Sequence, residues 1–217
     1  MPNGPSTKSD IMLRRGLFIT FEGPEGSGKT THSRLLCDFL RKKGFRVLHT
    51  REPGGVLISE KIRKILLDPK NKGMDVACEM LLYMAARAQI VKEKILPGLS
   101  QGKIVICDRF SDATLAYQGY AGGMDLKVIN NIAAIATKGL KPDITFLMDI
   151  DSGAGLLRAG RPRDRMERKS ISYHNKVRNG YLSIAKKEPK RIKILSSAGA
   201  IGLTQREIRK VVLKICH

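Results

Sequence analysis

Residues 23–30 read Gly-Pro-Glu-Gly-Ser-Gly-Lys-Thr, a glycine followed by four variable residues and then Gly-Lys-Thr. This is the phosphate-binding P-loop pattern. Its glycines let backbone N–H groups turn inward toward phosphate oxygens, and the helix that follows points its positive end at them. Lys29 can reach the β- and γ-phosphates of a nucleoside triphosphate, and the Thr30 hydroxyl can bind Mg²⁺. The residues predicted to bind the triphosphate are Gly23, Pro24, Glu25, Gly26, Ser27, Gly28, Lys29 and Thr30.

A second charged segment, Arg51-Glu52-Pro53-Gly54-Gly55, follows an apolar run. A basic side chain before a proline and two glycines suits an anion-binding site. Taken alone, the segment is more typical of an ordinary Pro-Gly turn that carries a surface arginine.

A third segment, Asp108-Arg109-Phe110, also follows an apolar run. Asp108 can hold Mg²⁺ through water, as the second acidic motif of P-loop enzymes does. Arg109 can form a bidentate pair with a phosphate. The alternative is an internal ion pair between the two. The residue after Asp108 is not the glutamate that activates water in motor-type ATPases, which favours phosphate transfer to a substrate over hydrolysis.

Residues 158–169 form an arginine-rich stretch interrupted by Gly160 and Pro162, which disfavour a continuous helix. Loops of this kind can close over triphosphate groups and neutralise charge in the transition state. The alternatives are a solvated basic loop or a patch that binds nucleic acid.

Short apolar runs must position these segments, and longer helical patterns separate them. The predicted strands are Leu17–Phe21, Arg46–Thr50, Lys103–Cys107, Ile144–Ile150 and Arg191–Leu195. The predicted helices are Lys29–Lys43, Val76–Ile95 (ending before Pro97), Asp125–Lys138 and Thr204–Ile215. Strand–helix alternation predicts an α/β fold with a parallel sheet and helices on both faces. In such a sheet, ligands bind at the carboxyl ends of the strands.

Composition limits the class of protein. The 217 residues are 42% hydrophobic, with 9 prolines, which is typical of an ordered globular chain. No apolar run approaches the roughly 20 residues of a membrane helix. The four cysteines are scattered and suggest no zinc site. We expect residues 1–15 to form a flexible tail and residues 16–217 to form one domain, with a lid at about 158–169.

Taken together, the segments resemble bacterial thymidylate kinases in type, order and spacing, from about Gly16 to the C-terminus. The matching motifs are Phe21-Glu22-Gly23, Gly28-Lys29-Thr30-Thr31, Thr50-Arg51-Glu52-Pro53-Gly54-Gly55, Ala85-Ala86-Arg87-Ala88-Gln89, Asp108-Arg109-Phe110, Ala116-Tyr117-Gln118-Gly119, Asp164-Arg165-Met166-Glu167 and Val177-Arg178-Asn179-Gly180-Tyr181-Leu182. The resemblance implies the fold of the P-loop nucleoside monophosphate kinases, a five-stranded parallel sheet with an arginine-rich lid. It also implies phosphate transfer from ATP to dTMP, giving dTDP and ADP for dTTP synthesis.

The resemblance assigns roles to the residues that would hold dTMP. Arg51 and Arg109 would bind its phosphate, and Glu25 would lie near its sugar and phosphate. Arg87 would contact the thymine edge. Tyr83 lies one helical turn earlier and would stack on the base, although packing in the core explains a tyrosine there equally well. Thr114 and Gln118 would read the base, and Tyr117 would exclude a ribose 2′-hydroxyl.

Some members of the family carry a catalytic arginine within the P-loop, at the position of Gly26 here. The resemblance therefore implies that the lid supplies it, from Arg161 or Arg163 with Arg158 behind them. The expected catalytic residues are Glu25, Lys29, Arg109, Arg161 and Arg163, with Mg²⁺ held by Thr30 and Asp108. The expected setting is a cytoplasmic homodimer that requires neither membrane nor nucleic acid.

Two alternatives remain at this point. One is a different P-loop kinase, for a nucleoside or for another monophosphate. The other is a nucleic-acid binder, prompted by a formal net charge of +20. The sequence shows no helix-turn-helix pattern, and 5% aromatic residues are few for a base-stacking surface.

Overall fold

The computed structural model describes residues 11, 13–160 and 164–216. Within this part of the chain, five strands form one parallel sheet in the order β2-β3-β1-β4-β5. Their bounds are β1 (Leu17–Glu22), β2 (Val47–Arg51), β3 (Ile104–Asp108), β4 (Ile144–Asp149) and β5 (Ile192–Ser196). The predicted α/β class, the parallel sheet and all five predicted strands are confirmed, with ends that differ by one residue in most cases.

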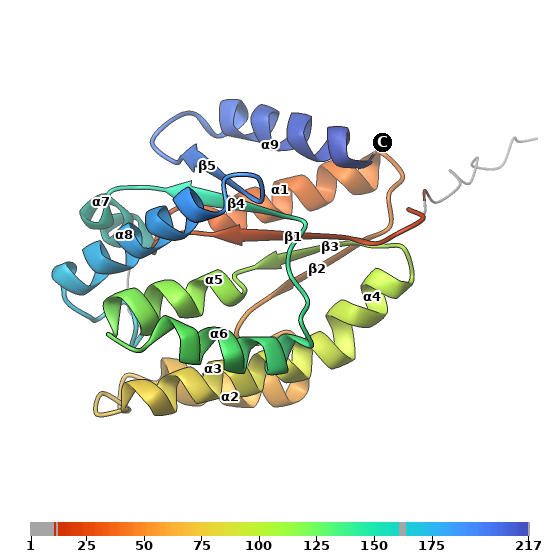
Figure 1. Cartoon of the computed structure of the whole chain (residues 1–217). Helices are drawn as coiled ribbons and strands as arrows, with labels where there is room; N and C mark the ends of the chain where they lie inside the picture. Colours follow the sequence, from red (N-terminus) through yellow and green to blue (C-terminus); the bar gives the residue numbers. More distant parts are fainter. Residues whose placement is uncertain (1–10, 12, 161–163, 217) are drawn as a thin grey trace, which may run out of the picture.

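Helices cover both faces of the sheet (Figure 1). The α-helices are α1 (Lys29–Lys42), α2 (Leu57–Leu67), α3 (Val76–Ile90), α4 (Leu96–Ser100), α5 (Ser111–Thr114), α6 (Leu126–Thr137), α7 (Ser152–Ala159), α8 (Ile171–Lys187) and α9 (Ile201–Cys216). Two π-helical segments, η1 (Val91–Ile95) and η2 (Leu115–Ala121), continue α3 and α5. None of the helices described combines the length and the apolar character needed to cross a membrane.

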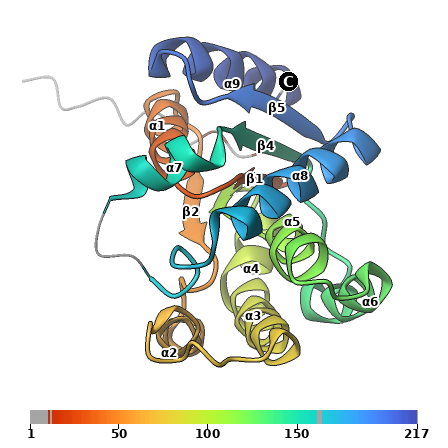
Figure 2. The same cartoon turned by 90° about the vertical axis from the view of Figure 1, so that its left-hand side faces the viewer.

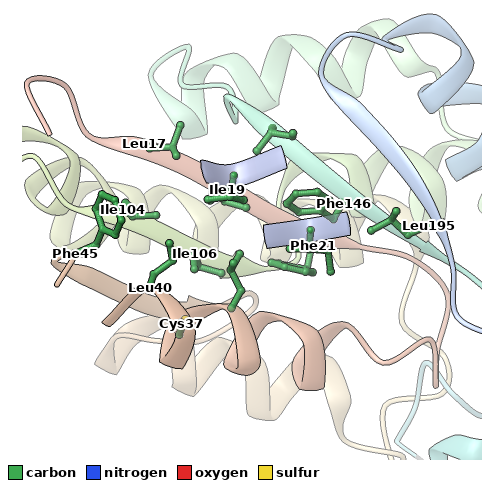
Figure 3. Close-up of a cluster of buried hydrophobic side chains, with 14 of the residues drawn as sticks. Leu17, Ile19, Phe21, Cys37, Leu40, Phe45, Ile104, Ile106, Phe146 and Leu195 are labelled. Carbon is green, nitrogen blue, oxygen red and sulfur yellow. The ribbon is translucent and has the colours of Figure 1, made fainter. Parts of the chain in front are cut away.

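The central strand β1 explains how the layers form. It lies between β3 and β4, with Ile19 opposite Ile106 on one side and Ile144 on the other. Side chains alternate along a strand, so Leu17, Ile19 and Phe21 all pack in one cluster between the sheet and the helices α1 and α9 (Figure 3). Phe18 points to the opposite face and packs with residues of α3, η1 and β3. By the same alternation Glu22 lies on that opposite face, which matters for the site.

One helix prediction needs correction, and several helices were not predicted. The predicted end of a helix before Pro97 is wrong, because η1 carries the helical chain on into α4. Pro97 stands in the first turn of α4, directly after the π-helical segment η1, and the backbone stays helical through this junction. The helices α2, α5, α7 and α8 were not predicted.

The described part of the predicted tail contacts the domain. Ile11 forms a parallel β-bridge with Phe45, and Leu13 packs against the cluster beneath α1. Arg15 pairs with Asp143 at 2.5 Å. Residues 1–10 and 12 lie outside the described residues.

Candidate active site

The carboxyl ends of β1, β2 and β3 meet at one edge of the sheet, which faces the viewer in Figure 2. A cleft of about 420 Å³ opens there. The predicted site residues that line it are Glu25, Gly26, Ser27, Gly28, Lys29, Thr30, Arg51, Tyr83, Asp108, Arg109, Thr114, Tyr117 and Gln118. Residues from distant parts of the sequence therefore share one cleft, as expected when functional side chains follow strand ends.

The loop between β1 and α1 has a backbone that requires glycine at more than one position. Gly28 immediately precedes α1 and has a φ of 82°. Gly26 has a φ of 65°, and a Cβ added to it would lie 1.9 Å from the carbonyl oxygen of Gly155 in α7. A side chain at position 26 would therefore collide with α7, so this loop cannot carry an arginine at that point without a shift of the helix.

Lys29 is buried at the base of the cleft. Its Nζ donates to the carbonyl oxygen of Pro24 at 2.6 Å and contacts the Ser27 hydroxyl at 3.4 Å. Burial, reinforced by the charge of Arg109, lowers the pKa of Lys29 to about 8, against the opposing effect of nearby carboxylates. The ammonium group is thus held inside the phosphate-binding loop before any anion binds.

Thr30 and Asp108 provide the chemistry for a magnesium ion. The Thr30 hydroxyl donates to the Asp108 carboxylate, and both residues line the cleft beside Lys29. No group of three or more His, Cys, Asp or Glu side chains suited to a metal occurs among the described residues. Mg²⁺ commonly uses only one or two protein oxygens and completes its shell with phosphates and water, so this pair fits it.

Arg109 lies at the centre of a hydrogen-bond cluster on the other side of the cleft. Nη1 donates to the Gly23 carbonyl oxygen at 3.1 Å and to the Tyr181 hydroxyl at 3.0 Å. Nη2 donates to Glu25 at 2.7 Å and to the Tyr117 hydroxyl at 3.1 Å. Burial alone would lower the pKa of Arg109, but Glu25 and the neighbouring hydroxyls raise it well above its ordinary value. The alternative of an Asp108–Arg109 ion pair is not what forms, because Arg109 pairs with Glu25 instead.

Glu25 is ionised in this setting. Burial favours its neutral form, but Arg109 and Lys29 outweigh that effect and lower its pKa to about 2. Tyr117 also donates to it at 2.7 Å. A carboxylate with so low a pKa is a poor proton acceptor at neutral pH, and its hydrogen bonds with Arg109 and Tyr117 hold these two side chains in place.

Arg51 projects into the cleft from the end of β2. It is half exposed and pairs with Glu60 of α2 at 2.9 and 3.1 Å. Arg63, one turn further along α2, also lines the cleft and donates to the Pro53 carbonyl oxygen at 2.8 Å. A phosphate bound between Arg51 and Arg109 would compete with Glu60 for one and with Glu25 for the other.

Arg87 does not line the cleft. It is 1% exposed and forms a buried ion pair with Glu52 at 2.7 Å. Its Nη1 donates to the Thr114 hydroxyl at 3.0 Å, and its Nη2 donates to the Phe110 carbonyl oxygen at 2.9 Å. Of these two hydrogen-bonded residues, Thr114 lines the cleft, and Arg87 is buried next to it.

The remaining predicted base-binding residues are Tyr83, which lines the cleft from α3, and Gln118, which lines it from η2. Gln118 is nearly fully buried and donates to Glu79 of α3 at 2.7 Å. That bond fixes the orientation of its amide.

The arginine-rich stretch divides into parts with different environments. Arg158 is in α7, lines the cleft and donates to the Ser197 carbonyl oxygen at 2.9 Å. Gly160, with a φ of 74°, ends that helix, which agrees with the prediction that residues 158–169 do not form one continuous helix. Arg165 is not a loop cation available to phosphates, because it is buried against Glu79 at 2.5 Å and donates to the Leu66 carbonyl oxygen. Arg161 and Arg163 lie outside the described residues.

Several residues that line the cleft were not predicted from the sequence. Arg63, Asp164 and Glu167 line the cleft without having been assigned a role. The signal for Arg63 was available, since the apolar spacing of Ile58, Ile62, Ile65 and Leu66 is typical of an amphipathic helix. No sequence motif indicated that Glu22 contacts groups beside Arg109. The one sequence feature that bears on it is the alternation of side chains along β1.

The fold and the cleft define a class: a P-loop enzyme with a triphosphate cradle at β1 and a second anion-binding region at the ends of β2 and β3. The family model for thymidylate kinase matches residues 21–208. The chain is 50% identical to a thymidylate kinase of Syntrophotalea carbinolica, over 85% of this chain and 89% of that protein. It is 45% identical to a thymidylate kinase of Symbiobacterium thermophilum, over 92% and 94%.

Among solved structures, the crystal structure of thymidylate kinase from Ehrlichia chaffeensis is similar, with a TM-score of 0.78 and 38% identity. That similarity covers 92% of this chain and 99% of the crystallised one. The chain belongs to the thymidylate kinase family. The resemblance inferred from the motifs is thereby confirmed.

Proposed function

We propose that the chain transfers the γ-phosphate of ATP to dTMP, forming dTDP and ADP. One observation carries this proposal: Lys29 in the phosphate-binding loop and Arg51 and Arg109 at neighbouring strand ends line the same cleft. A cradle for a triphosphate and a separate pair of guanidinium groups are what a reaction between two phosphorylated partners requires. Membership of the thymidylate kinase family supports dTMP as the second partner.

The proposed acceptor site uses the residues around Arg109. Arg51 and Arg109 hold the dTMP phosphate, and Glu25 keeps Arg109 oriented beside the sugar. Tyr83, Thr114 and Gln118 contact thymine. Tyr117, held by its bond to Glu25, crowds the position of a 2′-hydroxyl. Arg87 supports the base site through Thr114, and a direct contact with thymine remains a prediction.

The chemistry needs no general base. A phosphate monoester has a second pKa of about 6, so dTMP presents a dianionic oxygen at neutral pH. That oxygen forms a bond to the γ-phosphorus while the bond from this phosphorus to the β–γ bridging oxygen breaks, and ADP leaves with the electron pair. Lys29 and Arg109 offset the charge of the transition state and hold the two oxygens in line. Thr30 and Asp108 would hold Mg²⁺, which neutralises charge on the donor phosphates.

A coupled assay of ADP release with a panel of acceptors tests this proposal. We expect strong preference for dTMP over its ribonucleotide counterpart, dGMP and thymidine, with dUMP as the closest competitor. Comparable rates with thymidine would favour a nucleoside kinase, which needs a base to deprotonate a hydroxyl. Absence of transfer combined with salt-sensitive DNA binding would favour the nucleic-acid alternative.

We predict that Arg161→Ala or Arg163→Ala lowers kcat about tenfold or more, with little change in dTMP binding. The reason is that position 26 carries no side chain, so a loop arginine must neutralise the transferring phosphate. Steady-state kinetics of both single variants and the double variant measure this effect, with dTMP affinity measured separately by calorimetry. Near-normal turnover in all three variants would contradict the assignment.

We further propose a cytoplasmic homodimer that works without nucleic acid. The four cysteines are free in the structure, which suits a reducing compartment.

Leu81 of α3 and Val128 and Ile135 of α6 are apolar and exposed, and α3 and α6 pack together through a shared buried cluster. This face is the proposed dimer interface. Sedimentation equilibrium should give twice the chain mass for the native protein and the single mass for Ile135→Glu; a native monomer would rule the interface out.

A further inference from the structure

The backbone of Arg109 adopts an unusual conformation. Its φ of 69° lies in the left-handed region, which residues with a Cβ rarely adopt. Such a conformation persists where surrounding contacts hold it in place, and it often occurs at functional sites. The contacts that hold Arg109 therefore indicate which residues control where its guanidinium points.

Two buried side chains hold the backbone of Phe110, the residue that follows Arg109. The Phe110 N–H donates to Oε1 of Glu22 at 2.6 Å, and the Phe110 carbonyl oxygen accepts from Arg87 at 2.9 Å. On the preceding side, the N–H of Arg109 donates to the Phe21 carbonyl oxygen at 2.9 Å. Glu22 is 0% exposed and Arg87 is 1% exposed, so neither contact competes with bulk water.

Glu22 also reaches the other end of Arg109. Its Oε2 accepts from the Tyr181 hydroxyl at 2.8 Å, and the same hydroxyl accepts from Nη1 of Arg109 at 3.0 Å. A phenol has one proton to donate. Because that proton goes to Glu22, the lone pairs of the Tyr181 oxygen are left to face the guanidinium. A single carboxylate thus contacts the backbone beside Arg109 and orients the hydroxyl that binds its side chain.

Packing alone does not explain an acid at position 22. Burial and the nearby charge of Asp112 raise the pKa of Glu22, whereas Arg109 and the hydrogen bonds from Tyr181 and Phe110 act in the opposite direction and favour the carboxylate. Burying a charged or polar group without need is unfavourable, and an apolar side chain would fill the same space with less loss. Both carboxylate oxygens of Glu22 nevertheless accept hydrogen bonds, one from the Phe110 N–H and the other from the Tyr181 hydroxyl.

We propose that Glu22 is a positioning residue for Arg109. It holds the left-handed backbone through Phe110 and the guanidinium through Tyr181, so that Arg109 meets the acceptor phosphate in one orientation. This inference rests on the proposed role of Arg109 in binding that phosphate.

The substitution Glu22→Gln tests the proposal without changing the size of the side chain. If the amide oxygen keeps the bond from Phe110, the amide N–H₂ faces Tyr181 and forces its proton toward the guanidinium. If the amide is reversed, two donors meet at Phe110. We expect kcat/KM for dTMP to fall 10- to 100-fold, with KM for ATP changing less than threefold. In Tyr181→Phe, kcat/KM for dTMP should also fall, by about three- to tenfold.

A double-mutant cycle separates positioning from general damage. In an Arg109→Ala background, Glu22→Gln should change kcat/KM for dTMP less than twofold, because the side chain that it positions is gone. The matched control is Thr20→Val, two residues earlier on the same face of β1, which removes a buried hydrogen bond to Thr145 that does not touch Arg109. Thr20→Val should have native kinetics.

The possible results separate the role of Arg109 from the role of Glu22. Native kinetics in Arg109→Ala would overturn the role of Arg109, and the role of Glu22 with it. Impaired Arg109→Ala together with native Glu22→Gln, or effects that multiply fully in the double variant, would overturn only the role of Glu22. If Glu22→Gln does not fold, the kinetics of Tyr181→Phe test the proposal instead. Native kinetics in Tyr181→Phe would contradict it.

Discussion

Replacing Lys29 with methionine is expected to lower kcat/KM for ATP by about a thousandfold. Lys29 is held by Pro24 and Ser27 inside the phosphate-binding loop, so its charge is in place before the transferring phosphate develops more negative charge. Removing one such preorganised group commonly costs 10²- to 10³-fold in rate, and burial of Lys29 places it at the upper end of that range. Methionine keeps an unbranched side chain, one atom shorter, and removes the ammonium group with its charge and its hydrogen-bond donors.

The matched control is Lys42→Met, the same change at the exposed C-terminal end of α1. It should leave both the kinetics and the midpoint of thermal unfolding close to native. A Lys29→Met protein that folds normally and keeps its activity within tenfold of native would contradict the role assigned to this residue.

The pH dependence provides an independent measurement on the same group. Burial, with the charge of Arg109, lowers the pKa of Lys29 to about 8 in the free enzyme. A lysine binds phosphate only when protonated, so kcat/KM for ATP should decline as the pH rises above about 8, approaching tenfold per pH unit. Lys29→Arg should lack this alkaline limb, because a guanidinium stays protonated across the range.

The second large effect is expected for Arg109→Ala, which should lower kcat/KM for dTMP by about 10²- to 10³-fold. The variant loses a phosphate ligand. It also leaves Glu25 ionised beside the position of the acceptor phosphate, where two negative charges repel. The double variant Arg109→Ala/Glu25→Gln should therefore recover about tenfold of the loss. Initial-rate kinetics with varied dTMP measure both values, and Arg41→Ala on the exposed surface of α1 is the control.

The free energy of unfolding should depend on pH through the ionisation of Glu25. Glu25 has a pKa of about 2 in the folded chain against an ordinary 4.5. This shift corresponds to a contribution of up to about 3 kcal/mol, fully present above pH 4.5 and lost as the pH falls toward 2. The difference in free energy of unfolding between native protein and Arg109→Ala should accordingly shrink in acid. A difference that does not vary between pH 6 and pH 3 would show that the ion pair does not stabilise the fold.

Much of this cleft could be predicted from local sequence. The P-loop needs glycines at fixed positions, because only they adopt the required backbone at Gly26 and Gly28. The alternation of apolar strands with helices predicts a parallel sheet, and such a sheet brings Arg51 and Asp108 to the same edge as Lys29. These inferences succeed because they depend on neighbours in sequence and on the geometry of strands.

The pairing of buried arginines has a different origin. Arg165 lies in the stretch predicted to form a loop over the triphosphate, and Arg87 was predicted to contact thymine. In the structure Arg165 is buried against Glu79, and Arg87 is buried in an ion pair with Glu52. Nothing near either arginine in the sequence identifies these partners. A buried guanidinium pairs with whichever carboxylate the packing of helices brings within reach, and that choice is made between segments far apart in the chain.

By itself, then, the sequence determined the strands, the phosphate-binding loop and the family, since each follows from short-range pattern and backbone requirements. Only the tertiary structure decided which charges are free to meet a ligand and which are already paired. It also brought Glu22, Arg109 and Tyr181 together across 159 positions of sequence. The physical reason is that desolvated polar groups must find partners on folding, and those partners are set by three-dimensional packing.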